Sequence, residues 1–223
     1  MNQFNLHALA PYAPLFLRGI AVSLIATAIP TLVSFPLGLA FAVVRVGHSL
    51  RFIRIGLGIY VELVRNLPLL IVLYIIYFGL PAVGIRWDGI TSGIVALTLS
   101  STAFSSEIFR GGLAAIAPGQ QLAATSIGMR PLQAFRHVIF PQLIRVCFPA
   151  LGNQIIQVFL GSSLIAAIGG GELIYQSLSV GSITFRYFEV FTVAGILYVS
   201  AVQIFSITWR WGERLLNLSV SRD

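Results

Sequence analysis

Apolar residues gather in five runs that carry no charged side chain and are separated by short polar segments. At about 1.5 Å of helix rise per residue, each run approaches or exceeds the ~30 Å hydrocarbon core of a bilayer. Hydroxyl side chains dilute the third run most, and small polar residues suit a helix that packs against neighbours or lines a path. We therefore predict an all-α integral membrane protein with five transmembrane helices, over residues 19–44, 66–85, 89–106, 146–171 and 190–209.

The placement of arginines predicts the orientation of these helices. Of the 14 basic residues, all of them arginines, three lie on the outer side if the N-terminus is outside: Arg18, Arg86 and Arg186. The other eleven then lie on the inner side, whereas the acidic residues divide almost evenly. Because basic residues concentrate in cytoplasmic loops, we expect the N-terminus outside and the C-terminus inside. The inner set is Arg45, Arg51, Arg54, Arg65, Arg110, Arg130, Arg136, Arg145, Arg210, Arg214 and Arg222.

Residues 105–141 form the longest interruption of the apolar pattern, and this orientation makes them cytoplasmic. Alanine, glycine, proline and glutamine dominate the segment, so it does not resemble the roughly 20 apolar residues of a membrane span. We expect short helices at the membrane surface instead. One covers 121–127 and ends at Gly128, where glycine permits a left-handed turn. A second begins at Pro131, since proline suits the first helical position.

Composition excludes several classes of protein. The chain is 57% hydrophobic and 9% charged, with mean hydropathy +0.91, which a soluble domain of this size cannot bury. Its net charge of +7 fits basic cytoplasmic loops, and we expect no nucleic-acid partner. Without lysine, the chain has no phosphate-binding loop of the GxxxxGK[ST] type, so we expect no ATP hydrolysis by this chain.

The sequence also lacks several residue patterns that other functions would require. No carboxylate lies in the middle of a predicted span, which disfavours a proton-driven carrier. The three histidines and the single Cys147 are scattered and form no ligand pattern, so we expect no metal site and no cofactor in this chain. No pairing of a nucleophile with a base is visible, and we expect no catalytic residue.

The interruption also carries a motif. Gly119, Gln120, Ala123, Ala124 and Gly128 follow the pattern GQxxAAxxxG. Phe135, Val138 and Pro141 continue it as FxxVxxP, and ExxRGGL precedes it from Glu107 to Leu113. This resembles the "EAA" loop of inner-membrane permease subunits of binding-protein-dependent ABC importers, in their polar amino-acid branch. The resemblance implies that Gln121–Gly128 is a coupling helix that docks on an ATPase subunit, although Leu122 replaces the usual glutamate; a plain amphipathic connector is the alternative.

A second motif, Tyr60-x-Glu62-x-x-Arg65-x-x-Pro68, resembles the family signature at the start of the second core helix. Glu62 and Arg65 are three residues apart, so they share a helix face and can form an ion pair. Glu107 and Arg110 repeat this spacing. Pro68 should bend the helix. The two interpretations are an anchor at the membrane interface and a gate that moves when permease subunits rock.

Polar residues in the fourth predicted span form a third candidate site. Such side chains inside a membrane usually face protein or water, so they serve either interhelical hydrogen bonds or a substrate pathway. The family pattern K-[DG]-[TS]-S-L reads Leu-Gly-Ser-Ser-Leu from Leu160, without the usual basic residue. This departure and Leu122 favour a second permease subunit that differs from this one. The candidate pathway residues are Asn153, Gln154, Gln157, Ser162 and Ser163.

The resemblance implies a single transmembrane domain over residues 1–223, with a core of about 19–211, in a bacterial inner membrane. It implies a permease subunit that imports an amino acid by alternating access. The expected partners are a second permease subunit, two cytoplasmic ATPase subunits that bind ATP and Mg²⁺, and an external solute-binding protein. An uncoupled channel or secondary carrier, or a membrane scaffold, is the alternative function.

Overall fold

The computed structural model describes residues 5–47 and 51–215, and every regular element within them is helical. Arg222, counted above among the inner-side arginines, lies outside these residues. The elements, in chain order, are η1 Leu6–Tyr12, α1 Ala13–Val46, α2 Arg51–Asn66, α3 Leu69–Tyr74, η2 Ile75–Gly79, η3 Leu80–Val83, α4 Gly89–Ala115, α5 Pro118–Ser126, α6 Pro131–Ala134, η4 Phe135–Ile139, α7 Phe140–Gly161, η5 Ser162–Ile168, α8 Leu173–Thr184 and α9 Tyr187–Leu215.

Three or four segments of the described chain qualify as membrane spans by length and composition. Leu6–Val46, Pro131–Ile168 and Tyr187–Leu215 qualify outright, and Arg51–Asn66 with Leu69–Val83 qualifies as one broken span. These correspond to four of the five predicted runs. The remaining run lies in α4, whose many hydroxyl residues reduce its hydropathy, and it is not among the segments that qualify. The fifth span therefore stays a prediction.

The second predicted helix is not continuous. Proline lacks an N–H group and disfavours the helical conformation in the residue before it, so α2 ends at Asn66 and α3 starts after Pro68. The two helices meet at an angle of 110°. The bend predicted at Pro68 is thus confirmed; it lies near the start of the predicted run, and helical segments over Leu69–Val83 make up most of the rest.

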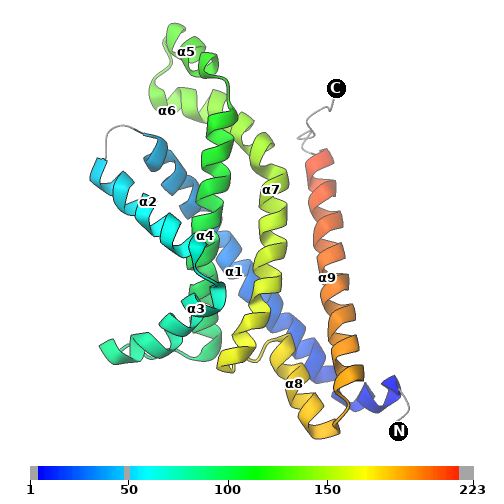
Figure 1. The fold of residues 1–223 in the computed structure, drawn as a ribbon. Coiled ribbons are helices and arrows are strands. Elements are labelled where there is room, and N and C mark those ends of the chain that lie inside the picture. Colours follow the sequence, from blue (N-terminus) through cyan, green and yellow to red (C-terminus); the bar gives the residue numbers. More distant parts are fainter. Residues whose placement is uncertain (1–4, 48–50, 216–223) are drawn as a thin grey trace.

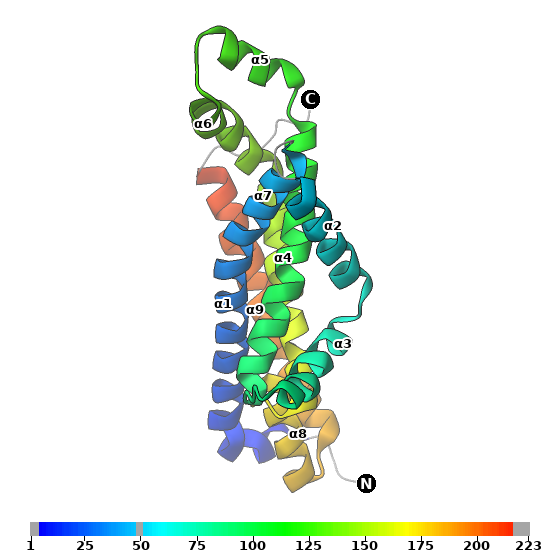
Figure 2. The ribbon, with the colours of Figure 1, turned by 90° about the vertical axis from the view of Figure 1, so that its left-hand side faces the viewer.

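Helix α4 lies at the centre of the fold, where α1, α2 and α7 pack against it (Figure 1). The start of the described chain and α8 lie at one end of the molecule. Helices α5 and α6 and the last turn of α9 lie at the opposite end, as both ribbon views show (Figures 1 and 2). The two ends of the described chain thus lie at opposite ends of the molecule, an arrangement that an odd number of membrane crossings would produce.

Small residues allow α1 and α4 to approach closely. The Ser34 hydroxyl lies 2.8 Å from that of Ser101, within hydrogen-bonding distance. A β-carbon at Gly38 would lie 2.6 Å from Cβ of Ser105 and 2.9 Å from the backbone nitrogen of Ser106. Since van der Waals packing and hydrogen bonds hold membrane helices together, this contact determines how α1 and α4 are spaced.

We expect Gly38→Ala to lower the thermal unfolding midpoint of the detergent-solubilised protein. Overpacking of this kind costs about 1–3 kcal/mol, because Cβ of Ser105 and backbone atoms, rather than the end of a flexible side chain, occupy the space. Gly56→Ala on α2 is the control, since nothing lies within 4 Å of a β-carbon there. Equal midpoints for the two variants would contradict this close packing.

Helix α8 had no counterpart among the predicted elements. Glu172 caps its first turn, accepting hydrogen bonds from the backbone N–H groups of Ile174 at 2.7 Å and Tyr175 at 2.9 Å. The side chain is fully buried, and burial raises the pKa of Glu172 to about 7 although these hydrogen bonds act in the opposite direction. The carboxylate of Glu172 therefore has a structural role at the end of the molecule opposite α5.

Candidate functional site

Glu107 on α4 is the centre of a charged cluster that joins three helices. Arg110 Nη2 lies 2.7 Å from Glu107 Oε2, and Arg45 on α1 also hydrogen-bonds to Glu107. Arg65 Nη1 on α2 lies farther away, at 3.6 Å. The hydrogen bonds from Arg110, together with the one from Arg45, lower the pKa of Glu107 to about 2, although partial burial acts in the opposite direction. The carboxylate is thus ionised at neutral pH.

Only one of the two predicted ion pairs is present in the structure. Glu107 and Arg110 form the expected contact. Glu62 and Arg65 do not pair, because α2 lies against α4 and Arg65 points to Glu107 instead. Glu62 is exposed and makes no hydrogen bond or ion pair with the described residues. Tyr60 donates a hydrogen bond to the Leu99 carbonyl at 2.7 Å, which ties α2 to α4.

A cavity of about 480 Å³ opens beside this cluster. It lies between α1, α2 and α4, and both Glu62 and Arg65 line it. Its lining also contains the three arginines that surround Glu107, so the cavity is strongly polar. The full lining is Arg45, Gly58, Val61, Glu62, Arg65, Asn66, Phe104, Glu107 and Arg110.

A second cavity, of about 390 Å³, lies between α3, α4 and α7 and has no charged residue in its lining. Gln154 and Gln157 reach it from α7, and Ser100 and Ser101 reach it from α4. The Gln154 amide donates to the Ser101 hydroxyl at 3.4 Å. These groups offer hydrogen bonds within an otherwise apolar wall, as in many small-molecule sites.

The other candidates in the fourth span lie elsewhere. Asn153 lines a different cavity, between α7 and α9, because one residue of helix turns its side chain about 100° from that of Gln154. Ser162 is fully buried and donates to the Phe159 carbonyl, and Ser163 donates to the Leu160 carbonyl. Of the five candidate pathway residues, Gln154 and Gln157 therefore meet at the uncharged cavity, whereas Asn153, Ser162 and Ser163 do not line it.

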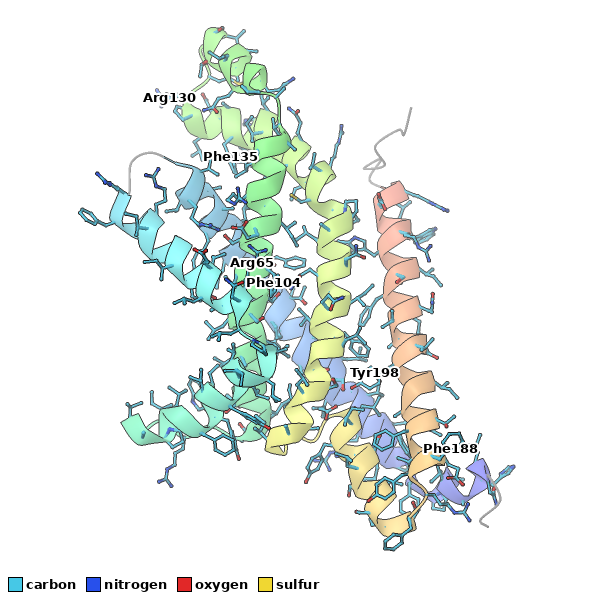
Figure 3. The ribbon with its side chains drawn as sticks, viewed as in Figure 1. Arg65, Phe104, Arg130, Phe135, Phe188 and Tyr198 are labelled. Carbon is cyan, nitrogen blue, oxygen red and sulfur yellow. The ribbon has the colours of Figure 1, made fainter. Side chains whose placement is uncertain are left out.

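Phe104 on α4 lines both cavities. The guanidinium carbon of Arg65 lies 5.7 Å from the centre of the Phe104 ring, within the range of a cation–π contact. Figure 3 shows these two side chains together where α2 reaches α4. An aromatic ring held by an arginine thus separates the uncharged cavity from the charged one.

The helix predicted over 121–127 is confirmed as α5, which begins earlier, at Pro118. Gly128 has a φ of 81°, and its N–H donates to the Thr125 carbonyl at 3.0 Å. Helix α6 then begins at Pro131, as predicted. Gln120 holds the start of α5 to α7, because its side chain accepts a hydrogen bond from Gln142 at 3.3 Å.

Helices α5 and α6 and the turn between them expose three large apolar side chains at the end of the molecule. Leu122, Ile127 and Leu132 are 67%, 74% and 77% exposed. Of the two alanines expected to form one bare face, Ala123 is exposed whereas Ala124 is buried. Gly119, Gln120 and Gln121 are also exposed. Large apolar side chains exposed at this end of the molecule indicate a contact with another protein.

Sequence reasoning missed three residues of these sites. Arg45 is distant in sequence from Glu107, so nothing indicated their contact. Ser101 had a weak signal, the hydroxyl residues recurring in its span. Phe104 looked like one of many packing phenylalanines. Within residues 5–47 and 51–215, no group of His, Cys, Asp or Glu is arranged to hold a metal ion.

The known proteins that resemble this chain match it over most of its length. The family described as "Binding-protein-dependent transport system inner membrane component" matches residues 34–216. The probable glutamine ABC transporter permease protein GlnM of Bacillus subtilis (strain 168) is 37% identical over 92% of this chain and 94% of that protein. The arginine transport system permease protein ArtQ of the same organism is 31% identical over 94% and 96%. A crystal structure of an amino acid ABC transporter with histidines superposes with a TM-score of 0.88 at 34% identity, covering 96% of this chain and 99% of that one.

Proposed function

The chain belongs to the family of binding-protein-dependent transport system inner membrane components, and from this premise we propose how its helices carry an amino acid inward. It is a multi-pass permease subunit of an ABC importer of amino acids. Such permeases are not enzymes and carry no cofactor, and a separate ATPase subunit hydrolyses ATP. An ATPase and a binding protein are its partners. The alternatives of a secondary carrier and a scaffold are thereby set aside.

The observation that carries the mechanism is the exposure of Leu122 on α5 and of Ile127 just after it, at the end of the molecule opposite α8. In the proposed orientation, with five spans and the N-terminus outside, α5 lies in the cytoplasm. It is the coupling helix, and its exposed residues enter a cleft of the ATPase. Leu122, in place of the usual acid, makes this contact apolar; a surface ion pair contributes only about 0–1 kcal/mol, so its loss is tolerable.

Movement of α5 reaches the membrane helices by two connections. The chain continues from α4 directly into α5, and Gln142 on α7 holds Gln120. Helices α4 and α7 are also the walls of the uncharged cavity. Closure of the ATPase pair would therefore shift the helices that line the substrate path. Glu107 links the same α4 to α1 and α2, so these helices move with it.

The substrate path passes through the uncharged cavity, and the substrate is a polar amino acid, as the names of the relatives support. Side-chain amides and hydroxyls both donate and accept hydrogen bonds, which suits a polar side chain. Gln154, Gln157 and Ser101 supply these groups.

We expect Gln154→Leu and Gln157→Leu each to reduce uptake by reconstituted transporter about tenfold, the effect of losing about 1.4 kcal/mol of interaction with the moving substrate. Asn153→Leu is the matched control, since it makes the same change on the same helix but lines another cavity. Uptake is measured in proteoliposomes with ATP inside. Equal rates for all three variants would exclude the cavity as the path.

The single domain of residues 1–223 pairs with a second permease subunit that is a different paralogue. Two departures support this proposal: Leu122 in the coupling helix and the absence of a basic residue before Gly161. Purification of the whole transporter with its partners tests both composition and function. We expect two distinct permease chains and an ATPase activity that polar amino acids, delivered by the binding protein, stimulate. Identical permease chains would contradict the pairing, and ATP-independent uptake would contradict the function.

A further inference from the structure

The cavity between α1, α2 and α4 contains an acidic group without an ion pair among the described residues and a basic group whose ion pair is long. Glu62 lines it and pairs with no described residue. Arg65 lies 3.6 Å from Glu107, whose oxygens already accept closer hydrogen bonds from Arg110 and Arg45. Arg65 is 41% exposed, so its guanidinium can take another acceptor. The cavity thus offers a carboxylate and a guanidinium from one helix face.

This pair has the chemistry that recognises the common part of every amino acid. At neutral pH the α-carboxylate is an acceptor, and a guanidinium binds it through two parallel hydrogen bonds. The α-ammonium is a donor for a carboxylate. The volume of about 480 Å³ lies in the range of small-molecule sites. Asn66, also in the lining, adds an amide that can donate and accept.

We propose that Glu62 and Arg65 form an inner site that binds the ammonium and the carboxylate of the transported amino acid after it leaves the uncharged cavity. The proposal rests on the proposed function and orientation. Phe104 lines both cavities, so an inward-moving substrate passes its ring. The Arg65 guanidinium lies on that ring, and withdrawing it to bind a carboxylate frees Phe104 to move. The uncharged cavity contacts the side chain, and the inner site contacts the charged groups.

An amino acid that accumulates inside should occupy this site and slow further import. The test uses the whole transporter in proteoliposomes, with binding protein and labelled glutamine outside, ATP inside, and increasing unlabelled glutamine inside. We expect internal glutamine to inhibit wild-type uptake. Glu62→Gln and Arg65→Gln should each raise the internal concentration that halves uptake about tenfold, a factor corresponding to about 1.4 kcal/mol. The external half-saturation should not change. Arg54→Gln, on the same helix outside the cavity, should match wild type.

Internal N-acetylglutamine separates binding from a structural role, because it lacks the ammonium. Arg65→Gln should still weaken its inhibition, whereas Glu62→Gln should leave it as in wild type. Arg65→Lys should recover part of the glutamine effect. Wild-type uptake that internal glutamine does not slow would overturn the inner site and leave the proposed function intact. An equal response of both variants to glutamine and N-acetylglutamine would also overturn it. Absence of any ATP-dependent uptake of amino acids would overturn the proposed function, and the inner site with it.

Discussion

Gly128→Val should separate ATP hydrolysis from transport. Gly128 has a φ of 81°, a conformation that costs other residues roughly 1–2 kcal/mol and a β-branched residue more. Because no atom lies within 4 Å of a β-carbon at this position, the effect arises from the backbone alone. The turn after α5 would reorganise and move Ile127 and Leu122 on the docking surface. We expect uptake to fall at least about tenfold while ATPase activity and membrane insertion persist.

Two variants of the same loop serve as controls for Gly128→Val. Gly128→Asn adds a side chain that tolerates the left-handed conformation, so it should retain most transport. Gly119→Ala adds one methyl group to α5 where space is open and φ is not positive, so uptake should fall much less than in Gly128→Val. Wild-type uptake in Gly128→Val, or equal losses in all three variants, would count against a docking surface that depends on this turn.

Glu107→Gln should cause the largest loss of stability. The variant keeps the shape of the side chain and removes the only negative charge that holds Arg45, Arg65 and Arg110 among the described residues. Breaking a buried ion pair by removing one partner costs about 3–5 kcal/mol, and the partial exposure of this cluster favours the lower end. For a chain of this size, the thermal unfolding midpoint in detergent should fall by roughly 5–10 °C.

The pH dependence of stability provides a second measurement for this cluster. The pKa of Glu107 lies at about 2 in the folded protein and near 4.5 when unperturbed. Its stabilisation is therefore complete above about pH 4.5 and is lost as the pH falls towards 2. Glu107→Gln should lack this part of the acid transition. Glu213→Gln is the control, because Glu213 forms no ion pair within the described residues; a shift as large as that of Glu107→Gln would contradict the role of the cluster.

Local rules predicted the features that depend on neighbouring residues. Hydropathy located α1, α3, α4, α7 and α9, because a bilayer admits only long apolar runs, but it did not locate α2 or α8. Proline at positions 68 and 131 and glycine at 128 marked the ends of helices, since each constrains or frees its own backbone. The contact of Glu107 with Arg110 followed from their spacing on one helix. The motif of residues 105–141 indicated the family, because all of its positions lie within one continuous stretch of chain.

Contacts between distant segments could not be predicted in this way. Glu62 and Arg65 have the spacing of an ion pair, yet the packing of α2 against α4 presents Arg65 to Glu107 and Phe104. Asn153 and Gln154 are adjacent in sequence but line different cavities, because the positions of α4 and α9 decide which side of α7 faces each cavity. These outcomes depend on the relative placement of helices, which a single sequence does not specify.

The most direct test of the mechanism determines on which side of the membrane α5 lies. Leu122→Cys in a Cys147→Ser background gives one thiol at a position that is 67% exposed. A membrane-impermeant maleimide should label it in inside-out vesicles and not in right-side-out vesicles, and the ATPase subunit should protect it. Labelling from the external side would contradict the orientation, the coupling helix and the inner site together.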